Sequence, residues 1–349
     1  MRLFPLKNSW RIVAIVCALH AEPARAQETA AEEVELRAEV LRVLPVDSAR
    51  RAFGEVTAPT SGEAEISGQY WDGCLRGAVE LPASGEHWQV MRPSRNRAWG
   101  HPAMIRFLEK FADQAAKATG WRGILIGDVS QPRGGPMLTG HASHQIGLDA
   151  DIYLLPMPNR AMTNEEIENL KSPSLLRADR RDVDPKVYAP AHLALLREAA
   201  RQPEVERVFV NAGIKRALCR DAESDREWLA KIRPVIGHDY HFHIRLYCPP
   251  GQAGCKEQEP PASGDGCGKE LDYWFSPGIL AAKPSRTGTS ISLRSMPAPC
   301  QQLARESTPA SIASVSHDAS VATAAGASAH RHTKATSRSA PAKSKKAKS

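Results

Sequence analysis

Two short stretches, far apart in the chain, contain the side chains best suited to chemistry. Residues 141–151 read HASHQIGLDAD, and residues 237–245 read GHDYHFHIR. Imidazole and carboxylate groups are preferred ligands of zinc, and three protein ligands with one open position are typical of a catalytic zinc site. The two stretches together therefore predict a zinc site to which each contributes ligands.

Each stretch contains an expected strand. Residues 241–246 alternate polar with apolar side chains, which is the period of a half-buried strand, so His241, His243 and Arg245 are expected on one face. Residues 148–154 also read as a strand, with Asp149 and Asp151 on one face. A loop residue, His144, precedes this strand. The predicted zinc ligands are His144, Asp151 and His243.

The other polar residues of the two stretches have predicted roles around these ligands. A fourth protein ligand would displace the catalytic water, so His241 is the predicted general acid/base, with His238 as its partner. His141 is predicted to face the substrate or to lie behind the metal ligands, although its spacing to His144 also permits it to bind the metal. Asp149 is expected to hold a ligand histidine by a hydrogen bond. Arg245 either meets a substrate carboxylate or is structural.

These residues also give the chain a family resemblance. With residues 134–140, the two stretches resemble the penicillin-insensitive murein endopeptidases, which are zinc peptidases related to the lysostaphin-type and D-Ala-D-Ala metallopeptidases. The resemblance spans about residues 48–300 and includes residues 73–78, 91–97, 210–215 and 266–268. It implies hydrolysis of D-alanyl-meso-diaminopimelyl cross-links in peptidoglycan without an active-site serine.

Two other functions remain open from the sequence. A D,D-carboxypeptidase or dipeptidase acting on uncross-linked stem peptides would use the same site, because the choice depends on the shape of the groove. A non-catalytic, zinc-bearing protein that binds the cell envelope would keep the ligands and lose the acid/base residues. Since His238 and His241 are both present, the enzyme is favoured.

The N-terminus predicts export. Residues 1–26 combine basic residues, a short apolar run and a small-x-small end, which is typical of a cleaved signal peptide. The run is too short to span a bilayer, so no transmembrane segment is expected after cleavage, and the predicted location is the periplasm. Of the seven cysteines, Cys17 lies in this segment, and the even remainder indicates disulfides.

Six cysteines permit fifteen pairings. Their spacing together with the family resemblance favours three bridges: Cys74–Cys300, Cys219–Cys267 and Cys248–Cys255. These bridges are expected to hold the loops rich in proline and glycine that follow residue 246.

The C-terminal end differs from the rest of the chain in composition. Residues 301–349 are rich in alanine, serine and lysine and are expected to form a disordered basic tail. The net charge of this tail and the leader together exceeds the whole-chain value of +7, so the part between them is slightly acidic and no nucleic-acid-binding surface is predicted. A basic tail could associate with anionic envelope polymers.

The remaining pattern predicts an α+β fold: a mostly antiparallel sheet carrying the zinc site, packed helices and disulfide-stapled loops. Residues 27–47 are expected to be a charged, poorly packed lead-in, and residues 48–300 the zinc peptidase domain. Helices are expected at 102–119 and 190–201, strands at 121–129 and 205–211, and helical turns at 214–219 and 225–231. A long loop over the site is expected at 156–186.

Overall fold

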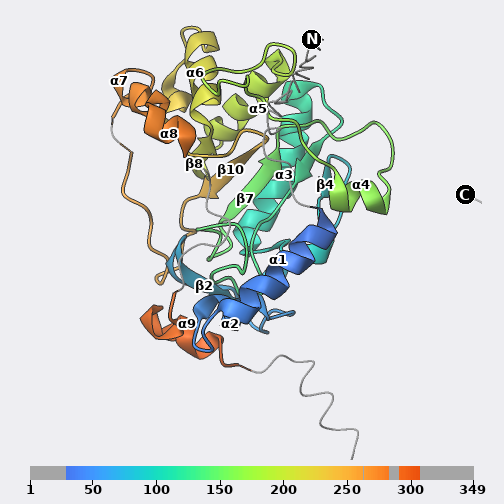
Figure 1. The fold of residues 1–349 in the computed structure, drawn as a ribbon, viewed down its shortest axis with the longest axis vertical. Helices are drawn as coiled ribbons and strands as arrows, with labels where there is room; N and C mark the ends of the chain where they lie inside the picture. The colour runs from blue at the N-terminus through green and yellow to red at the C-terminus, as the bar shows by residue number, and fades with distance from the viewer. Residues whose placement is uncertain (1–28, 262, 283–290, 307–349) are drawn as a thin grey trace, which may run out of the picture. The chain divides into compact units, whose positions relative to one another are not determined.

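A six-stranded mixed sheet forms the centre of the molecule. The structure is a computed structural model that describes residues 29–261, 263–282 and 291–306, all of which belong to one compact unit, residues 1–309. The strand order is β4-β6-β7-β10-β8-β9 (Figure 1). The strands are β4 (Trp88–Val90), β6 (Ile124–Ile126), β7 (Asp149–Tyr153), β10 (His241–Leu246), β8 (Val205–Val210) and β9 (Ile232–Pro234).

The middle of this sheet is antiparallel, and only its two outer pairs are parallel. β10 pairs antiparallel with both β7 and β8, and β6 pairs antiparallel with β7. The outer pairs β4/β6 and β8/β9 are parallel. Short two-stranded sheets flank it: β1 (Glu65–Gln69) with β2 (Asp72–Arg76), and β3 (Val79–Glu80) with β5 (Trp99–Gly100). The expected α+β class is confirmed.

Two amphipathic helices, α3 (Pro102–Thr119) and α5 (Pro190–Arg201), cover one face of the sheet (Figure 1). α3 has a proline in its first turn and ends at Gly120 in the left-handed region, as a helix stop requires. The helices and the sheet share one core, which includes Leu108, Phe111, Leu195, Ile152, Phe242 and Ile244. The alternate residues of β7 and β10, which include the acids and histidines, therefore lie on the opposite face.

Several elements differ from the sequence-based expectations. β10 is buried along its whole length rather than half buried, because residues outside the sheet, such as His144 and Tyr70, cover its polar face. β6 is shorter than the expected strand 121–129. The expected loop 156–186 includes the helix α4 (Asn164–Asn169), which begins with a capping box between Thr163 and Glu166. The two expected helical turns are α6 (Ala212–Asp221) and a 3₁₀ helix, Glu227–Lys231.

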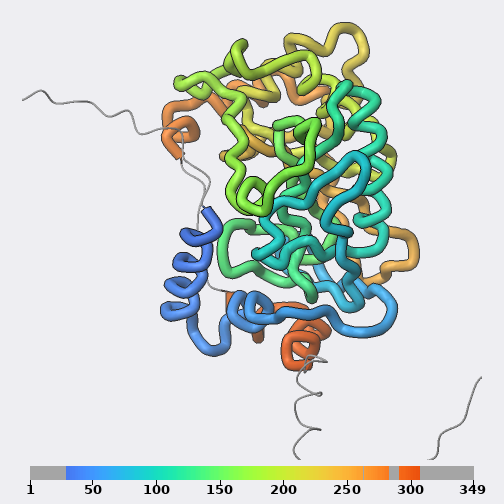
Figure 2. Tube along the Cα trace, turned by 90° about the vertical axis from the view of Figure 1, so that its right-hand side faces the viewer, coloured from blue at the N-terminus to red at the C-terminus, as the bar shows by residue number. Residues whose placement is uncertain are grey.

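The short helix α2 (Ala49–Gly54) packs with the last helix of the described chain, α9 (Ala298–Leu303). The two helices lie side by side at one end of the molecule (Figure 2), and Phe53 packs there with Leu303 and the disulfide Cys74–Cys300. The described residues continue to Glu306, whose carboxylate pairs with Arg76. The expected signal peptide and residues 307–349 of the expected tail lie outside the described residues.

The N-terminal segment forms a helix, α1 (Ala30–Val43), in which only Glu33 and Val40 are buried. It runs along one side of the molecule (Figure 2). The three expected disulfides, Cys74–Cys300, Cys219–Cys267 and Cys248–Cys255, are all confirmed. Among the described residues, no helix combines the length and apolar character needed to cross a membrane.

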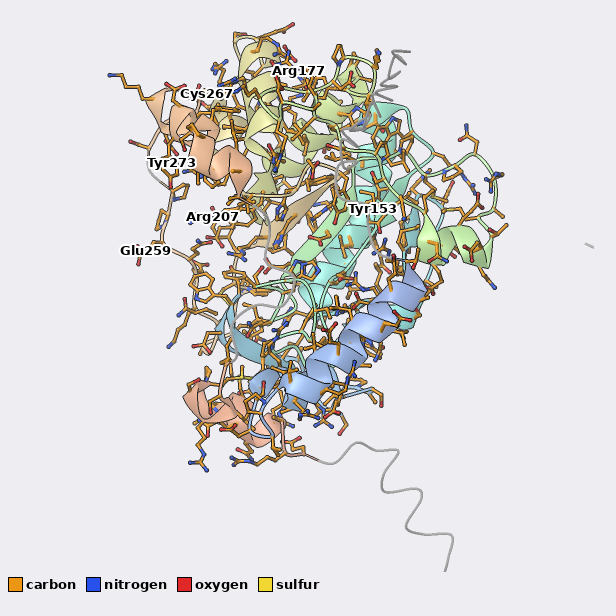
Figure 3. All side chains as sticks on the ribbon, in the orientation of Figure 1. Tyr153, Arg177, Arg207, Glu259, Cys267 and Tyr273 are labelled. Carbon is orange, nitrogen blue, oxygen red and sulfur yellow. A yellow bond between two sulfur atoms is a disulfide. The ribbon has the colours of Figure 1, made fainter. Side chains whose placement is uncertain are left out.

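The short helices α7 (Lys269–Asp272) and α8 (Pro277–Ala281) follow the second disulfide. Figure 3 shows Cys267 and Tyr273 in this part of the chain, away from Tyr153 at the end of β7. The loop before them is held to β8 by Arg207, which donates to the carbonyl of Glu259. The irregular segment that follows β10 is thus anchored by the disulfide Cys248–Cys255 and by side-chain contacts.

Candidate active site

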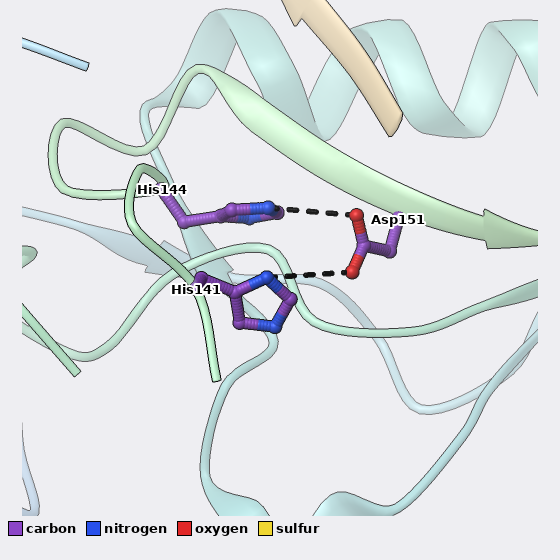
Figure 4. A group of neighbouring side chains, drawn as sticks. All are labelled: His141, His144 and Asp151. Carbon is purple, nitrogen blue, oxygen red and sulfur yellow. Dashed lines mark ion pairs between the residues drawn. The ribbon is translucent and has the colours of Figure 1, made fainter. Parts of the chain in front are cut away.

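The carboxylate of Asp151 lies at the centre of four imidazole rings. Its Oδ1 atom is 3.5 Å from Nε2 of His144 and 3.6 Å from Nδ1 of His243. Its Oδ2 atom is 3.7 Å from Nδ1 of His141 and 3.6 Å from Nε2 of His241. Figure 4 shows His141 and His144 facing the two oxygens. The structure therefore brings all three predicted ligands and the predicted base to one point.

These separations fit a shared cation better than direct hydrogen bonds. A hydrogen bond between nitrogen and oxygen is about 2.7–3.2 Å long, whereas ligand atoms about 2.0–2.2 Å from one tetrahedral zinc lie about 3.3–3.6 Å apart. Nε2 of His144 and Oδ1 of Asp151 are buried and have no hydrogen-bond partner among the described residues. Unpaired buried polar atoms are costly, so the residues present fit a metal ion that both atoms would bind.

A backbone carbonyl lies behind the ring of His144 and a carboxylate behind that of His243. Nδ1 of His144 donates to the carbonyl of Val129 at 2.7 Å, which leaves Nε2 facing the site. Nε2 of His243 lies 3.0 Å from Oδ1 of Asp149, which leaves Nδ1 facing the site. Metal-binding histidines are typically oriented by such a carbonyl or carboxylate behind the ring.

Burial differs between the two sides of Asp151. The side chains at Oδ1 are almost completely enclosed, with His144 0 % exposed and His243 6 % exposed. The side chains at Oδ2 are more accessible, with His141 19 % exposed and His241 11 % exposed. A substrate would therefore reach His141 and His241 before it reached His144 or His243.

Burial also affects the charge of two of the site histidines. It lowers the pKa of His241 to about 3 and that of His243 to about 4, so both rings are neutral at neutral pH. Burial would raise the pKa of Asp151, but the surrounding imidazoles hold it well below its usual value. Neutral imidazoles and an ionised carboxylate are the forms that bind metal.

Asp149 and Arg245 form the floor of the site. Arg245 donates to both oxygens of Asp149, at 2.8 and 3.0 Å, and its guanidinium lies over the ring of Tyr70. The same carboxylate accepts from the backbone N–H of His144 at 2.9 Å. Arg245 is only 3 % exposed, which favours its structural alternative over contact with a substrate.

His238 lies beside the predicted base. The ring centroids of His238 and His241 are 4.8 Å apart, and Nδ1 of His238 is 3.3 Å from the carbonyl of Ile236. His238, His241 and Asp151 also bring one ligand atom each within mutual reach, as do His141, His144 and Asp151. The donor set is therefore larger than the three ligands predicted from the sequence.

One acid that contacts the site was not predicted. Asp128 accepts from Nε2 of His141 at 2.8 Å, and it also pairs with Arg95 and Arg97. It directly follows the apolar residues 124–127. An acid at the end of a buried strand is the sequence signal that would have pointed to it, but its partners are distant in the chain.

Four imidazoles around one ionised carboxylate, on a face of the central sheet, form a donor set suited to a metal ion. Comparison with known proteins gives the family. The model of the family described as "Penicillin-insensitive murein endopeptidase" matches residues 66–305. This chain belongs to that family, which is a peptidase family.

Proteins named penicillin-insensitive murein endopeptidase are similar to this chain over most of their lengths. The protein of Haemophilus influenzae is 46% identical over 248 residues, which are 69% of this chain and 83% of that protein. The protein of Yersinia enterocolitica is 40% identical over 71% of this chain and 89% of its own length. That of Klebsiella pneumoniae is 40% identical over 72% and 90%, respectively.

Proposed function

We propose that this chain is a zinc-dependent murein D,D-endopeptidase that hydrolyses D-alanyl-meso-diaminopimelyl cross-links in peptidoglycan. The observation that carries the proposal is the arrangement of four imidazole nitrogens 3.5–3.7 Å from one carboxylate, Asp151. The printed names of the relatives support murein as the substrate and an internal peptide bond as the target.

The proposed zinc ligands are His144 Nε2, an oxygen of Asp151, and His243 Nδ1. Two features favour this set over one that includes His241. The ring of His144 is oriented by its hydrogen bond to Val129, and the carboxylate of Asp149 lies 3.0 Å behind the ring of His243. No described carboxylate or carbonyl lies at hydrogen-bond distance behind the ring of His241, whose Nδ1 is unpaired among the described residues. The proposed ligands are also the more deeply buried of the four histidines around Asp151.

Zinc bound by these three residues would lower the pKa of a water at the open position and polarise the scissile carbonyl. His241 is the proposed general acid/base, because it lies on the same face of β10 as His243 and on the more accessible side of Asp151, where it would accept a proton from the attacking water. It would then donate that proton to the leaving amine. His238, beside it, would hold the ring of His241 in place.

The periplasm is the proposed location, because the substrate lies there and the chain has three disulfides. The leader that would direct export and most of the basic tail lie outside the described residues. Association of that tail with anionic envelope polymers remains a separate proposal, based on its composition alone.

Digestion of purified muropeptides, followed by mass analysis of the products, tests the function. Conversion of cross-linked dimers to monomers is expected, with loss of activity after chelation and recovery on addition of zinc. Release of free D-alanine from uncross-linked stem peptides would identify a carboxypeptidase instead. Full activity after exhaustive removal of metal would contradict the zinc dependence.

A further inference from the structure

Behind His141 lies a buried cluster of two acids and two arginines that joins the site to the helix α1. Nη1 of Arg95 and Nη1 of Arg97 are each 2.9 Å from Oδ2 of Asp128. Nη2 of Arg95 is 3.4 Å, and Nη2 of Arg97 is 3.3 Å, from Oε1 of Glu33. Each guanidinium therefore bridges the same two carboxylates.

Glu33 is the one member of this cluster that comes from α1. It is 5 % exposed, and it also accepts a hydrogen bond from the hydroxyl of Thr139, two residues before His141. Burial would raise the pKa of Glu33, but Arg95 and Arg97 hold it below its usual value. A charged side chain is rarely this buried unless it is paired, so the position of Glu33 depends on the two arginines.

Other hydrogen bonds also hold α1 against the rest of the described chain. The backbone N–H of Ala30 donates to the side chain of Asn169 at the end of α4, and Arg37 donates to the carbonyl of Gly54 at the end of α2. A capping box between Thr29 and Glu32 begins the helix one turn before Glu33. The family model begins at residue 66, so α1 precedes the part of the chain that this model matches.

The charges of the cluster are balanced two against two. Asp128 offers the single oxygen Oδ2 to three donors, namely Arg95, Arg97 and Nε2 of His141. Without the charge of Glu33, both guanidiniums would depend on Asp128 alone in a site of low dielectric. The competition for that oxygen would weaken the hydrogen bond from His141.

That hydrogen bond sets the orientation of His141. Because Nε2 donates to Asp128, the ring presents the unprotonated Nδ1 to Asp151. We propose that Glu33 is a positioning residue of the active site: it balances Arg95 and Arg97, and thereby leaves Asp128 free to orient His141. The inference rests on the proposed function in one respect, that His141 belongs to the working site.

Three variants test this inference. Glu33→Gln keeps the size of the side chain and removes its charge. Glu35→Gln makes the same change at an exposed position of α1 and is the matched control. The double variant Glu33→Gln/Arg95→Met removes one charge of each sign, so the cluster is again neutral and Asp128 keeps Arg97 as its partner.

Two measurements are needed. The first is the ¹⁵N NMR spectrum of the imidazole of His141 in the full, metal-free protein, which reports which ring nitrogen carries the proton. The second is kcat and KM for cleavage of cross-linked muropeptides. We expect Glu33→Gln to shift His141 from one tautomer to a mixture of both. We also expect it to lower kcat by about 10-fold, which is the lower end of the loss seen when a group that orients a site residue is removed. Glu35→Gln should match the wild type.

The double variant separates positioning from mere packing of α1. If Glu33 acts through the charge balance, the double variant regains the single tautomer of His141 and most of the lost kcat. Wild-type His141 signals in Glu33→Gln, or a double variant no better than Glu33→Gln, would overturn the inference. A wild-type protein that leaves muropeptides intact would refute the proposed function, while the NMR comparison would still decide the role of Glu33.

Discussion

Asp151 and His243 face each other directly across the β7/β10 pair, and Oδ1 of the acid is 3.6 Å from Nδ1 of the histidine. The same register places Arg245 opposite Asp149, two residues after His243 on β10 and two residues before Asp151 on β7. A slip of one residue would turn every one of these side chains to the other face of the sheet. Two proposed ligands and the acid–arginine pair beneath them therefore depend on one strand register.

The roles of the site histidines can be separated by substitution. His241→Ala should keep a zinc content near one per chain but lower kcat by about 10²–10⁴-fold, because a general acid/base is lost. His144→Ala should lose the metal, because Nε2 of His144 faces Oδ1 of Asp151. Metal analysis of the purified variants, together with muropeptide digestion, checks both.

A histidine outside the site provides the control. His87 contacts the carbonyl of Arg122, so His87→Ala should keep both zinc and activity. Zinc loss in His241→Ala as large as that in His144→Ala would mean that the ligand and the base have been exchanged.

Asp149 should govern metal affinity without binding the metal. It lies behind the ring of His243 and accepts from the backbone of His144. Asp149→Asn should weaken zinc binding by about 10–100-fold, as is common for groups that orient ligands. Competition with a chromophoric chelator measures this affinity. Asp113→Asn, at an exposed position of α3, is the control, and equal affinities in the two variants would refute the role of Asp149.

The long-range disulfide should contribute most to stability. Cys74 and Cys300 are separated by 226 residues, whereas Cys248 and Cys255 are separated by 7. In the chain-entropy model, replacing the first pair with alanines should cost about 5 kcal/mol, and replacing the second pair about 2 kcal/mol. Urea unfolding followed by tryptophan fluorescence measures both. Equal losses would show that chain entropy is not the main contribution.

The N-cap of α3 should make stability depend on pH. Nδ1 of His101 accepts from the backbone N–H of Ala103 at 3.1 Å, which requires an unprotonated nitrogen. Burial, with a smaller effect of Arg106, lowers the pKa of His101 to about 4. The unfolded chain therefore binds a proton at a higher pH, near 6.5, and the stability from this residue is present above 6.5 and is lost as the pH falls towards 4.

His101→Asn is the variant that tests this dependence, because asparagine is also a good N-cap and does not titrate. Between pH 7 and pH 4, the free energy of unfolding of the wild type should fall by about 3 kcal/mol more than that of His101→Asn. Since the site histidines titrate in both proteins, the difference isolates His101. Parallel pH profiles of the two proteins would contradict the prediction.

The sequence by itself determined the parts of this protein that depend on local pattern. Helical periodicity, with a proline at the start and a glycine stop, predicted α3 with the bounds that the structure has. The alternation in residues 241–246 placed His241 and His243 on one face of β10, opposite Phe242 in the core. Side-chain direction along a helix or strand follows from backbone geometry alone, so neighbouring residues suffice to predict it.

Tertiary structure decided which groups meet across the chain. The conformation of the loop before β7, which the sequence does not predict, determines how the histidines divide between the two oxygens of Asp151. His144 and His243 face Oδ1, and His141 and His241 face Oδ2. The charged composition of residues 27–47 gave no sign that Glu33 would be buried against Arg97. Such contacts depend on strand register and on packing between distant segments, because a charge is buried only where the fold supplies its partner.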